Sequence, residues 1–169
     1  MDNKAPTACL VSTGEEVLRG EILDANNNYL ANILGEHGFD VQLMMTAGDR
    51  REDLYFVIDS ALQRADYLFM SGGLGPTEDD LTTAVAAELA NQTLVFDEAS
   101  WQAIVDLFRQ YNLEPGENNK KQALFPASAE ILANHNGTAP GFSLTLERHG
   151  GKKTIIALPG PPRELHPMI

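Results

Sequence analysis

The chain has 169 residues, of which 43% are hydrophobic, and this size and composition exclude a disordered or fibrous protein and predict one domain with a sizeable core. Twelve basic and twenty-four acidic residues give a formal net charge of −12, which disfavours nucleic acid and anionic membranes as partners. No apolar run approaches the roughly 20 residues of a membrane span, and residues 1–6 lack the pattern of an export signal. Cys9, the single cysteine, is expected to lie buried in a strand, and together these features predict a cytoplasmic protein.

Predicted strands and helices alternate through the first ninety residues. Short apolar runs predict strands, and apolar residues that recur at helical spacing predict helices. The predicted elements are a strand at 8–12, a helix that begins within 24–28 and ends at Gly38, a strand at 39–45, a helix at 51–64, a strand at 67–70 and a helix at 81–90. The second strand alternates apolar with mostly polar residues, which is typical of a strand toward a sheet edge.

The second half of the chain predicts shorter elements. In order, they are an apolar segment at 93–96, a helix at 97–110 capped by Asp97, a polar turn at 114–119, a helical turn at 120–125 stopped by Pro126, and strands at 131–132, 141–146 and 154–158. Gly150 and Gly151 indicate a hairpin turn between the last two strands, and a new helix begins near Arg163. The whole pattern predicts a three-layer α/β/α domain over residues 1–169, with a mainly parallel, doubly wound sheet and an added β-hairpin, as the first domain of a longer protein.

The glycine-rich segment at residues 71–82 is the most informative stretch of the sequence. It follows the predicted strand at 67–70 and contains Gly72, Gly73 and Gly75, then three acidic residues, then a helix start. Glycines let a backbone approach a ligand closely, and free N–H groups at a helix start favour anions such as phosphate. Because three carboxylates repel a phosphate unless a cation lies between them, the segment predicts a metal-bridged phosphate site.

Four predicted loops, at 13–20, 47–50, 71–80 and 159–163, leave strand ends where a doubly wound sheet binds ligands. They contain Glu15, Asp49, Asp79 and Asp80, which we expect to converge, and such carboxylates can hold Mg²⁺ together with substrate phosphates. Each acid also has a plainer interpretation: a helix cap for Asp79 and Asp80, a turn residue for Asp49, and a solvated charge for Glu15. The four histidines lack metal-ligand spacing and are expected at the surface.

Several ordered motifs resemble the N-terminal domain of competence/damage-inducible protein A (CinA), a member of the molybdopterin-binding superfamily that includes MoaB, MogA and MoeA. The motifs are residues 72–82, residues 12–22 followed by Asp24 and Asn26, Gly48 with Asp49, and residues 117–123, 137–142 and 158–164. The resemblance spans nearly the whole chain. It implies a three-layer α/β domain that binds a phosphorylated nucleotide or pterin ligand at the glycine segment, and it makes a homo-oligomer the expected assembly.

The resemblance also implies roles for individual residues. Asp49 and Asp80 are the implied catalytic residues, and Asp79 joins them as an implied metal ligand. The implied substrate-binding residues are Ser12, Gly14, Glu15, Gly72, Gly73, Gly75, Thr77, Asn118, Lys121, Gly141, Pro159 and Gly160. Among these, Lys121 is expected to neutralise a phosphate oxygen, whereas Glu15 stands where relatives of the family vary.

CinA-type domains are associated with hydrolysis of ADP-ribose to AMP and ribose 5-phosphate, with Mg²⁺ or another divalent metal such as Co²⁺ and with help from K⁺. The resemblance therefore implies a metal-dependent hydrolase of a nucleoside diphosphate sugar. Two alternatives stay open: a nucleotide- or pterin-binding module without catalysis, and a molybdopterin adenylyltransferase. Leu74 argues against the adenylyltransferase, because the molybdenum-cofactor enzymes usually carry threonine after the glycine pair. The nicotinamide mononucleotide amidohydrolase domain of full-length CinA has no counterpart in this sequence, so no deamidase activity is assigned to it.

Overall fold

The computed structural model describes residues 5–169 of the protein. Residues 1–4 lie outside the described part, and most of the segment expected to lack an export signal falls on them. Among the described residues, no helix combines the length and the apolar character needed to cross a membrane.

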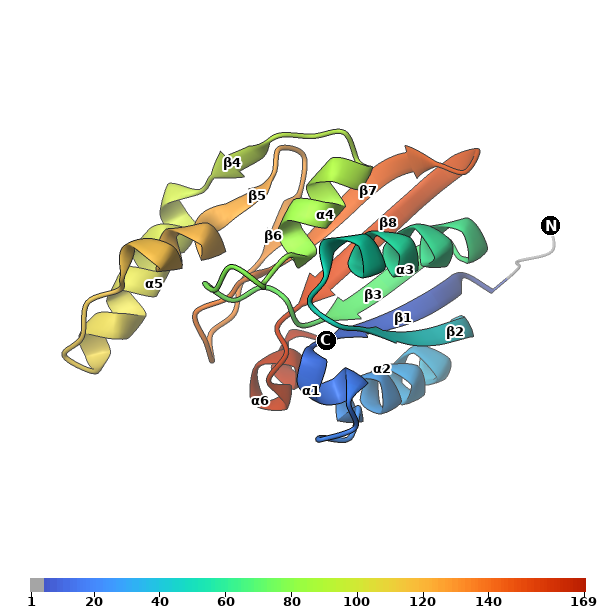
Figure 1. The fold of residues 1–169 in the computed structure, drawn as a ribbon, viewed down its shortest axis with the longest axis horizontal. Helices are drawn as coiled ribbons and strands as arrows, with labels where there is room; N and C mark the ends of the chain where they lie inside the picture. Colours follow the sequence, from blue (N-terminus) through green and yellow to red (C-terminus); the bar gives the residue numbers. More distant parts are fainter. Residues whose placement is uncertain (1–4) are drawn as a thin grey trace.

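A six-stranded sheet of order β2-β1-β3-β8-β7-β6 forms the centre of the molecule (Figure 1). Its strands are β1 (Thr7–Thr13), β2 (Asp40–Ala47), β3 (Tyr67–Ser71), β6 (Glu130–Leu132), β7 (Gly141–Arg148) and β8 (Gly151–Leu158). Strands β2, β1, β3 and β8 pair in parallel, whereas β7 pairs antiparallel with both β8 and β6. The predicted class of fold is therefore confirmed, and β2 lies at a sheet edge as its alternating sequence predicted.

Successive residues of β1 point into two different cores, as the two-residue period of a strand requires. Cys9 and Val11 pack with α3 (Arg51–Arg64) and α4 (Thr82–Leu89), whereas Ala8 and Leu10 pack with α2 (Ala25–Glu36) and α6 (Pro162–Leu165). Figure 1 shows the helices on opposite faces of the sheet. Because β1 is buried on both faces, its sequence is the continuous apolar run from which it was predicted. Cys9 is fully buried, as expected.

Helix ends follow the capping residues that the sequence offers. The side chain of Asp24 accepts a hydrogen bond from the backbone N–H of Asn27 at 3.0 Å and starts α2, and Asp97 accepts one from Ser100 at 2.7 Å and starts α5 (Glu98–Gln110). Gly38 follows α2 with a φ of 81°, a conformation that suits a glycine after a helix.

The segment between α4 and β6 differs from the prediction. The polar residues expected in a turn begin a 3₁₀ helix at Glu117–Ala123, and the residues expected to complete a helical turn form strand β5 (Leu124–Pro126). Strand β5 pairs antiparallel with β4 (Leu94–Phe96) in a separate two-stranded sheet. With α5, these strands extend to the left of the main sheet in Figure 1. The prediction was wrong because β5 is defined by pairing with a distant segment rather than by its local pattern.

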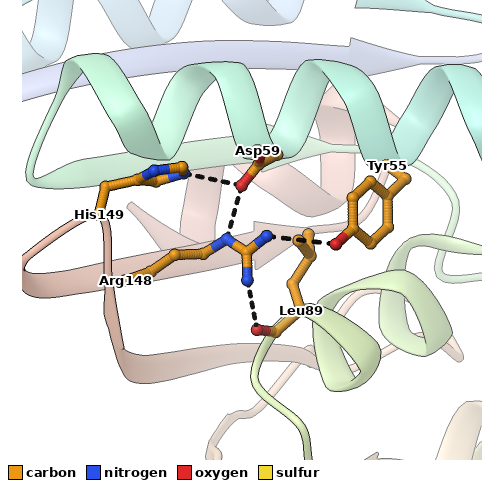
Figure 2. A network of polar contacts seen from close by, with 5 residues as sticks. All are labelled: Tyr55, Asp59, Leu89, Arg148 and His149. Carbon is orange, nitrogen blue, oxygen red and sulfur yellow. Dashed lines mark hydrogen bonds and ion pairs between the residues drawn. The ribbon is translucent and has the colours of Figure 1, made fainter.

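The β7–β8 hairpin turns at His149 and Gly150, one residue earlier than predicted, since Arg148 already pairs with Gly151. Both turn residues have positive φ, 50° and 77°, as tight two-residue hairpins require. Figure 2 shows how a polar network fastens this turn to α3 and α4. Arg148 donates to the Asp59 carboxylate at 2.5 Å, to the Leu89 carbonyl at 3.2 Å and to the Tyr55 hydroxyl at 3.2 Å.

His149 completes the network, with its Nε2 atom 2.8 Å from the same Asp59 oxygen. Burial alone would raise the pKa of Asp59, but the hydrogen bonds and charges of Arg148 and His149 outweigh burial and hold that pKa below its ordinary value. His149 is therefore an exposed residue, as predicted, and it also pairs with Asp59. The network lies at the amino-terminal end of β8, opposite the end where β8, β1 and β3 finish.

Candidate functional site

A cleft of 350 Å³ opens at the carboxyl ends of β1, β3 and β8. The lining residues come from the loops that follow these strands, from the end of β2 and from the segments around Gln122 and Thr138. They are Thr13, Gly14, Glu16, Asp49, Gly72, Gly73, Leu74, Gly75, Pro76, Thr77, Asp79, Asp80, Gln122, Thr138, Ala139, Pro159, Gly160, Pro161 and Glu164. The cleft therefore lies where a doubly wound sheet reverses its strand order, between β1 and β3.

The chain after β3 takes a path that only glycine permits. Gly72 and Gly73 have φ values of 98° and 69°. A Cβ atom on Gly72 would lie 2.7 Å from the backbone oxygen of Thr13, and one on Gly73 would lie 2.2 Å from the Thr82 hydroxyl. That hydroxyl donates to the Gly72 carbonyl at 2.9 Å and ties the turn to the first residue of α4. The glycine pair thus exposes bare backbone at the floor of the cleft.

Asp80 shapes the loop rather than capping the helix. The N-cap residue of α4 is Leu81, which makes no side-chain cap, whereas the Asp80 carboxylate accepts from the Thr77 N–H at 2.9 Å and from the Thr77 hydroxyl at 2.5 Å. Both bonds use Oδ2, so the carboxylate is anchored by one oxygen. A Cβ atom on Gly75 would lie 2.4 Å from that oxygen, and this explains why glycine is needed there.

Asp79 is an exposed acid of the loop. The Thr77 hydroxyl and the attraction of Lys121 hold the pKa of Asp79 below its ordinary value, and Asp79 therefore stays ionised. The Lys121 ammonium donates to the Thr77 carbonyl, which places this cation against the loop. Lys121 lines a shallow cavity behind the loop, together with Leu74 and Asp80, rather than the cleft itself.

Asp49 faces the acids of the two neighbouring loops. Burial raises the pKa of Asp49, and the negative charges of Asp79, Glu15 and Glu16 raise it further. Asp49 and Glu15 also hold each other's backbones: the Glu15 N–H donates to Asp49 Oδ2 at 3.4 Å, and the Asp49 N–H donates to Glu15 Oε1 at 3.3 Å. Asp49, Asp79 and Asp80 thus line one cleft, whereas Glu15 is outside its lining, and Asp49 is the acid whose ionisation is disfavoured.

The charge of the cleft is one-sided. Of the described residues that line it, five are acidic and none is basic. Residues 5–169 nevertheless contain no group of three or more His, Cys, Asp or Glu side chains close enough to hold a metal ion by themselves. Mg²⁺ commonly takes one or two protein carboxylates and completes its shell with water and substrate phosphates. The residues present fit a cation held in this shared way and do not form a closed protein metal site.

The remaining predicted residues divide into those in the cleft and those outside it. Gly14, Pro159 and Gly160 line it. Ser12 lies beneath, where its hydroxyl donates to Asp24 at 2.6 Å, and Glu15 pairs with Arg19 at 3.0 Å on the outer side of its loop.

Asn118 and Gly141 are also outside the cleft lining. Asn118 lies in the 3₁₀ helix, where its side chain approaches Gly116. Gly141 begins β7, and a Cβ atom on it would lie 2.5 Å from the Ala157 carbonyl oxygen. Close packing of two strands therefore explains this glycine without a ligand.

Sequence reasoning missed five polar residues of the cleft: Thr13, Glu16, Gln122, Thr138 and Glu164. Glu16 follows the predicted Glu15 in α1 (Glu15–Leu18), a single helical turn that directs the second acid toward the cleft. Gln122 donates to the Thr138 hydroxyl at 3.0 Å, and Glu164 is 7% exposed and accepts from Asn134 at 2.8 Å. All five lie within the motifs that carry the family resemblance, and their place in those motifs is the signal that could have identified them.

The comparisons with known proteins agree with this geometry. The family model described as "Probable molybdopterin binding domain" matches residues 9–169. A "CinA-like protein" of Syntrophomonas wolfei subsp. wolfei is 44% identical over 163 residues, which cover 96% of this chain but 38% of that protein. The chain thus spans well under half the length of this relative.

Solved structures share the fold. The crystal structure of a CinA protein of unknown function from Thermoplasma acidophilum matches with a TM-score of 0.84 and 31% identity, over 97% of this chain and 94% of that chain. The molybdopterin biosynthesis enzyme MoaB of Thermus thermophilus matches with a TM-score of 0.62 over 96% of this chain and 86% of that one. At 15% identity, the likeness to MoaB concerns the fold alone.

Proposed function

The chain belongs to the family of molybdopterin-binding domains, as a CinA-like member, and we propose that it hydrolyses the pyrophosphate of nucleoside diphosphate sugars, ADP-ribose first among them. The products are AMP and ribose 5-phosphate. The observation that carries the proposal is the glycine-floored cleft, whose lining among residues 5–169 includes five acidic side chains and no basic one. Such a cleft suits a diphosphate that arrives with a cation, because backbone amides receive the phosphate and the carboxylates receive the cation.

The chain's own residues divide the work of the reaction. Gly72 and Gly73 let the pyrophosphate approach the backbone, and Lys121 offsets charge from behind the loop. A water oxygen forms a bond to one phosphorus, the bridging P–O bond breaks, and the bridging oxygen leaves on the other phosphate. Asp49 lines the cleft beside the glycine floor and accepts the proton of that water.

Asp49, Asp79 and Asp80 are the side chains that would hold a divalent cation such as Mg²⁺ or Co²⁺. When bound, the cation supplies charge stabilisation for the departing phosphate. Asp80 can contribute through the oxygen that does not bind Thr77, so its loop contacts and a cation contact are compatible.

Release of AMP from ADP-ribose tests the proposal. The purified protein is incubated with ADP-ribose, Mg²⁺ or Co²⁺, and K⁺, and AMP is measured by chromatography. We expect turnover in the unchanged protein and its loss in Asp80→Asn and Asp49→Asn. Absence of AMP under all metal conditions, or turnover that Asp80→Asn leaves unchanged, would refute hydrolysis at this cleft.

A second candidate is a nucleotide- or pterin-binding module without catalysis. The observation that favours it is that the Asp80 and Asp49 carboxylates already accept hydrogen bonds from loop N–H groups, and such bonds shape a binding site without any reaction. Calorimetry that shows binding of ADP-ribose or AMP without turnover would support it.

Adenylylation of molybdopterin is a third candidate, favoured by the fold shared with MoaB, and incubation with ATP and molybdopterin would reveal it through release of pyrophosphate. A cytoplasmic location and a homo-oligomeric state form part of the leading proposal. Sedimentation of the purified protein tests the oligomeric state.

A further inference from the structure

A second cavity of 290 Å³ adjoins the cleft, at the ends of β1 and β3. We name it the α1–α2 pocket, after the helices that flank it. Its lining residues are Ser12, Thr13, Glu16, Val17, Ile22, Leu23, Asp24, Ala25, Asn26, Ser71, Gly160, Pro161 and Pro162. Thr13, Glu16, Gly160 and Pro161 line both cavities and form a ridge between them.

A side chain of α2 helps to hold the ridge in place. Asn26, in the first turn of α2, donates through Nδ2 to the Gly160 carbonyl at 2.7 Å. Gly160 in turn packs against the glycine floor, since a Cβ atom on it would lie 3.5 Å from the Gly72 Cα atom. A ligand whose phosphates lie at Gly72 and Gly73 therefore meets the α1–α2 pocket directly across Gly160.

The chemistry of the two cavities is complementary. The cleft is acidic and floored by glycine, which suits phosphates, a cation and sugar hydroxyls. The α1–α2 pocket has apolar walls from Val17, Ile22 and Leu23, with Ile22 and Leu23 as much as 52% and 92% exposed. These side chains could cover an apolar ring, and covering it would remove their own surface from water.

Hydrogen-bond acceptors lie within the same pocket. The Asp24 carboxylate accepts from Ser12 and Asn27, and Asn26 Oδ1 is buried without a donor among the described residues. A buried acceptor without a donor is unfavourable until a donor reaches it. A flat ring with N–H groups on its edge, such as the adenine of a nucleotide, would suit this pocket. Its faces would contact the apolar walls, and its N–H groups would donate to the acceptors.

We propose that the α1–α2 pocket binds the nucleobase half of the ligand, with the pyrophosphate over the Gly160 ridge and the sugar phosphate in the acidic cleft. The inference rests on the proposed function for its ligand class. Binding pockets for small molecules usually measure about 300–1,000 Å³, and a ligand as long as ADP-ribose fits the two cavities jointly better than either one.

A larger groove of 590 Å³ between α5 and β6 is the competing location. It meets the cleft only at Thr138, and the bonds Gln122–Thr138 and Asn134–Glu164 close the wall between them. A ligand held at the glycine floor would have to pass over this wall. The α1–α2 pocket shares four lining residues with the cleft, so a ligand can reach from one cavity into the other without crossing this wall.

Two matched tryptophan substitutions separate the locations. Ala25→Trp fills the α1–α2 pocket, and Ala103→Trp fills the groove; both alanines are exposed residues of helices, so both variants should fold. The probes are the non-hydrolysable α,β-methylene analogue of ADP-ribose and inorganic pyrophosphate, measured by calorimetry with Mg²⁺. We expect Ala25→Trp to lower the affinity for the analogue by about tenfold or more and to leave the affinity for pyrophosphate unchanged. Ala103→Trp should change neither affinity.

Leu23→Asp is a second variant that cannot disturb the core, because Leu23 is almost fully exposed. It should also weaken the analogue selectively, by about threefold or more, through loss of the apolar cover. Unchanged affinity for the analogue in both Ala25→Trp and Leu23→Asp, or weakening in Ala103→Trp instead, would overturn the assignment. Selective weakening in a protein that releases no AMP from ADP-ribose would refute hydrolysis alone and leave the pocket assignment standing.

Discussion

At one end of the central sheet, where β1 and β3 finish, Asp49 faces other acids and its pKa is raised by burial and by their charges. At the opposite end, the β7–β8 turn places Arg148 and His149 against Asp59, and the pKa of Asp59 is lowered despite burial. The two side chains are chemically identical and belong to one domain, so their surroundings alone make the two pKa shifts differ in direction. Under the proposed function, the first end receives a cation from outside, whereas the charges at the second end are already paired within the protein.

The largest expected effect is on catalysis at the acidic end. Asp49→Asn removes the proton acceptor, and we expect AMP release to fall by about 10²- to 10⁴-fold. The same change removes repulsion among the acids, so the free energy of unfolding should rise by up to about 1 kcal/mol, the scale of an exposed charge interaction. Activity and urea denaturation of one preparation measure both. A variant that loses activity together with stability would show that Asp49 is a structural residue.

Backbone conformation gives the next largest effect. Gly72→Ala must accommodate a positive φ and a Cβ atom 2.7 Å from a backbone oxygen, which we expect to cost about 3 kcal/mol or more of folding free energy. Gly150→Ala is the control at the other end of the sheet, because Gly150 also has a positive φ but no atom within 4 Å of the added Cβ. Thermal denaturation should show a clearly larger loss for Gly72→Ala; equal losses would mean that the close approach to Thr13 is unimportant.

Substitution of Asp59, at the end where the charges are paired, should lower stability, whereas substitution of Asp49 should raise it. Asp59→Asn removes charge-assisted hydrogen bonds from Arg148 and His149, and we expect the free energy of unfolding to fall by about 1.5–3 kcal/mol. Catalysis should be unchanged at a temperature where the variant stays folded, since the network is remote from the cleft. A tenfold loss of AMP release in the folded variant would break the proposed division between the two ends.

The smallest effect is a dependence of stability on pH. Because the pKa of Asp59 is lowered in the folded protein, its contribution is fully present above the ordinary value of 3.8 and is lost as pH falls below it. The raised pKa of Asp49 has the reverse sign, so its unfavourable contribution develops as pH rises above that same ordinary value. In urea denaturation from pH 3 to pH 7, the free energy of unfolding of Asp49→Asn should therefore increase relative to that of the unchanged protein as pH rises. A difference in free energy that stays constant with pH would contradict this interpretation.

Local sequence was enough to predict the elements whose pattern is set by burial on one or two faces. The helix at Arg51–Arg64 has its predicted bounds, and the apolar runs became β1 and β3. Strand β5 was not predictable in this way, because its three residues are a strand only through pairing with β4, some thirty residues earlier. The hairpin turn was placed one residue late because either member of the Gly150–Gly151 pair could supply a positive φ.

The site was predictable where a motif fixed the backbone and less so where packing brought distant residues together. The glycine turn and the shared cleft of Asp49 and Asp79 follow from loops that leave the same edge of the sheet. Glu164 and Gln122 reach the cleft through tertiary contacts that no local pattern reports. Gly141 illustrates the converse, since a glycine in a family motif serves strand packing here and lies outside the cleft lining.

The most direct test of the central claim is the affinity of the α,β-methylene analogue of ADP-ribose with and without Mg²⁺, measured by calorimetry. If the acidic end is built for an anion that arrives with a cation, chelation of the metal should weaken binding by about tenfold or more, because unscreened carboxylates repel the diphosphate. Asp59→Asn should retain the full metal dependence. Binding of equal strength with and without Mg²⁺ would contradict the claim that the uncompensated acids of the cleft receive a cation.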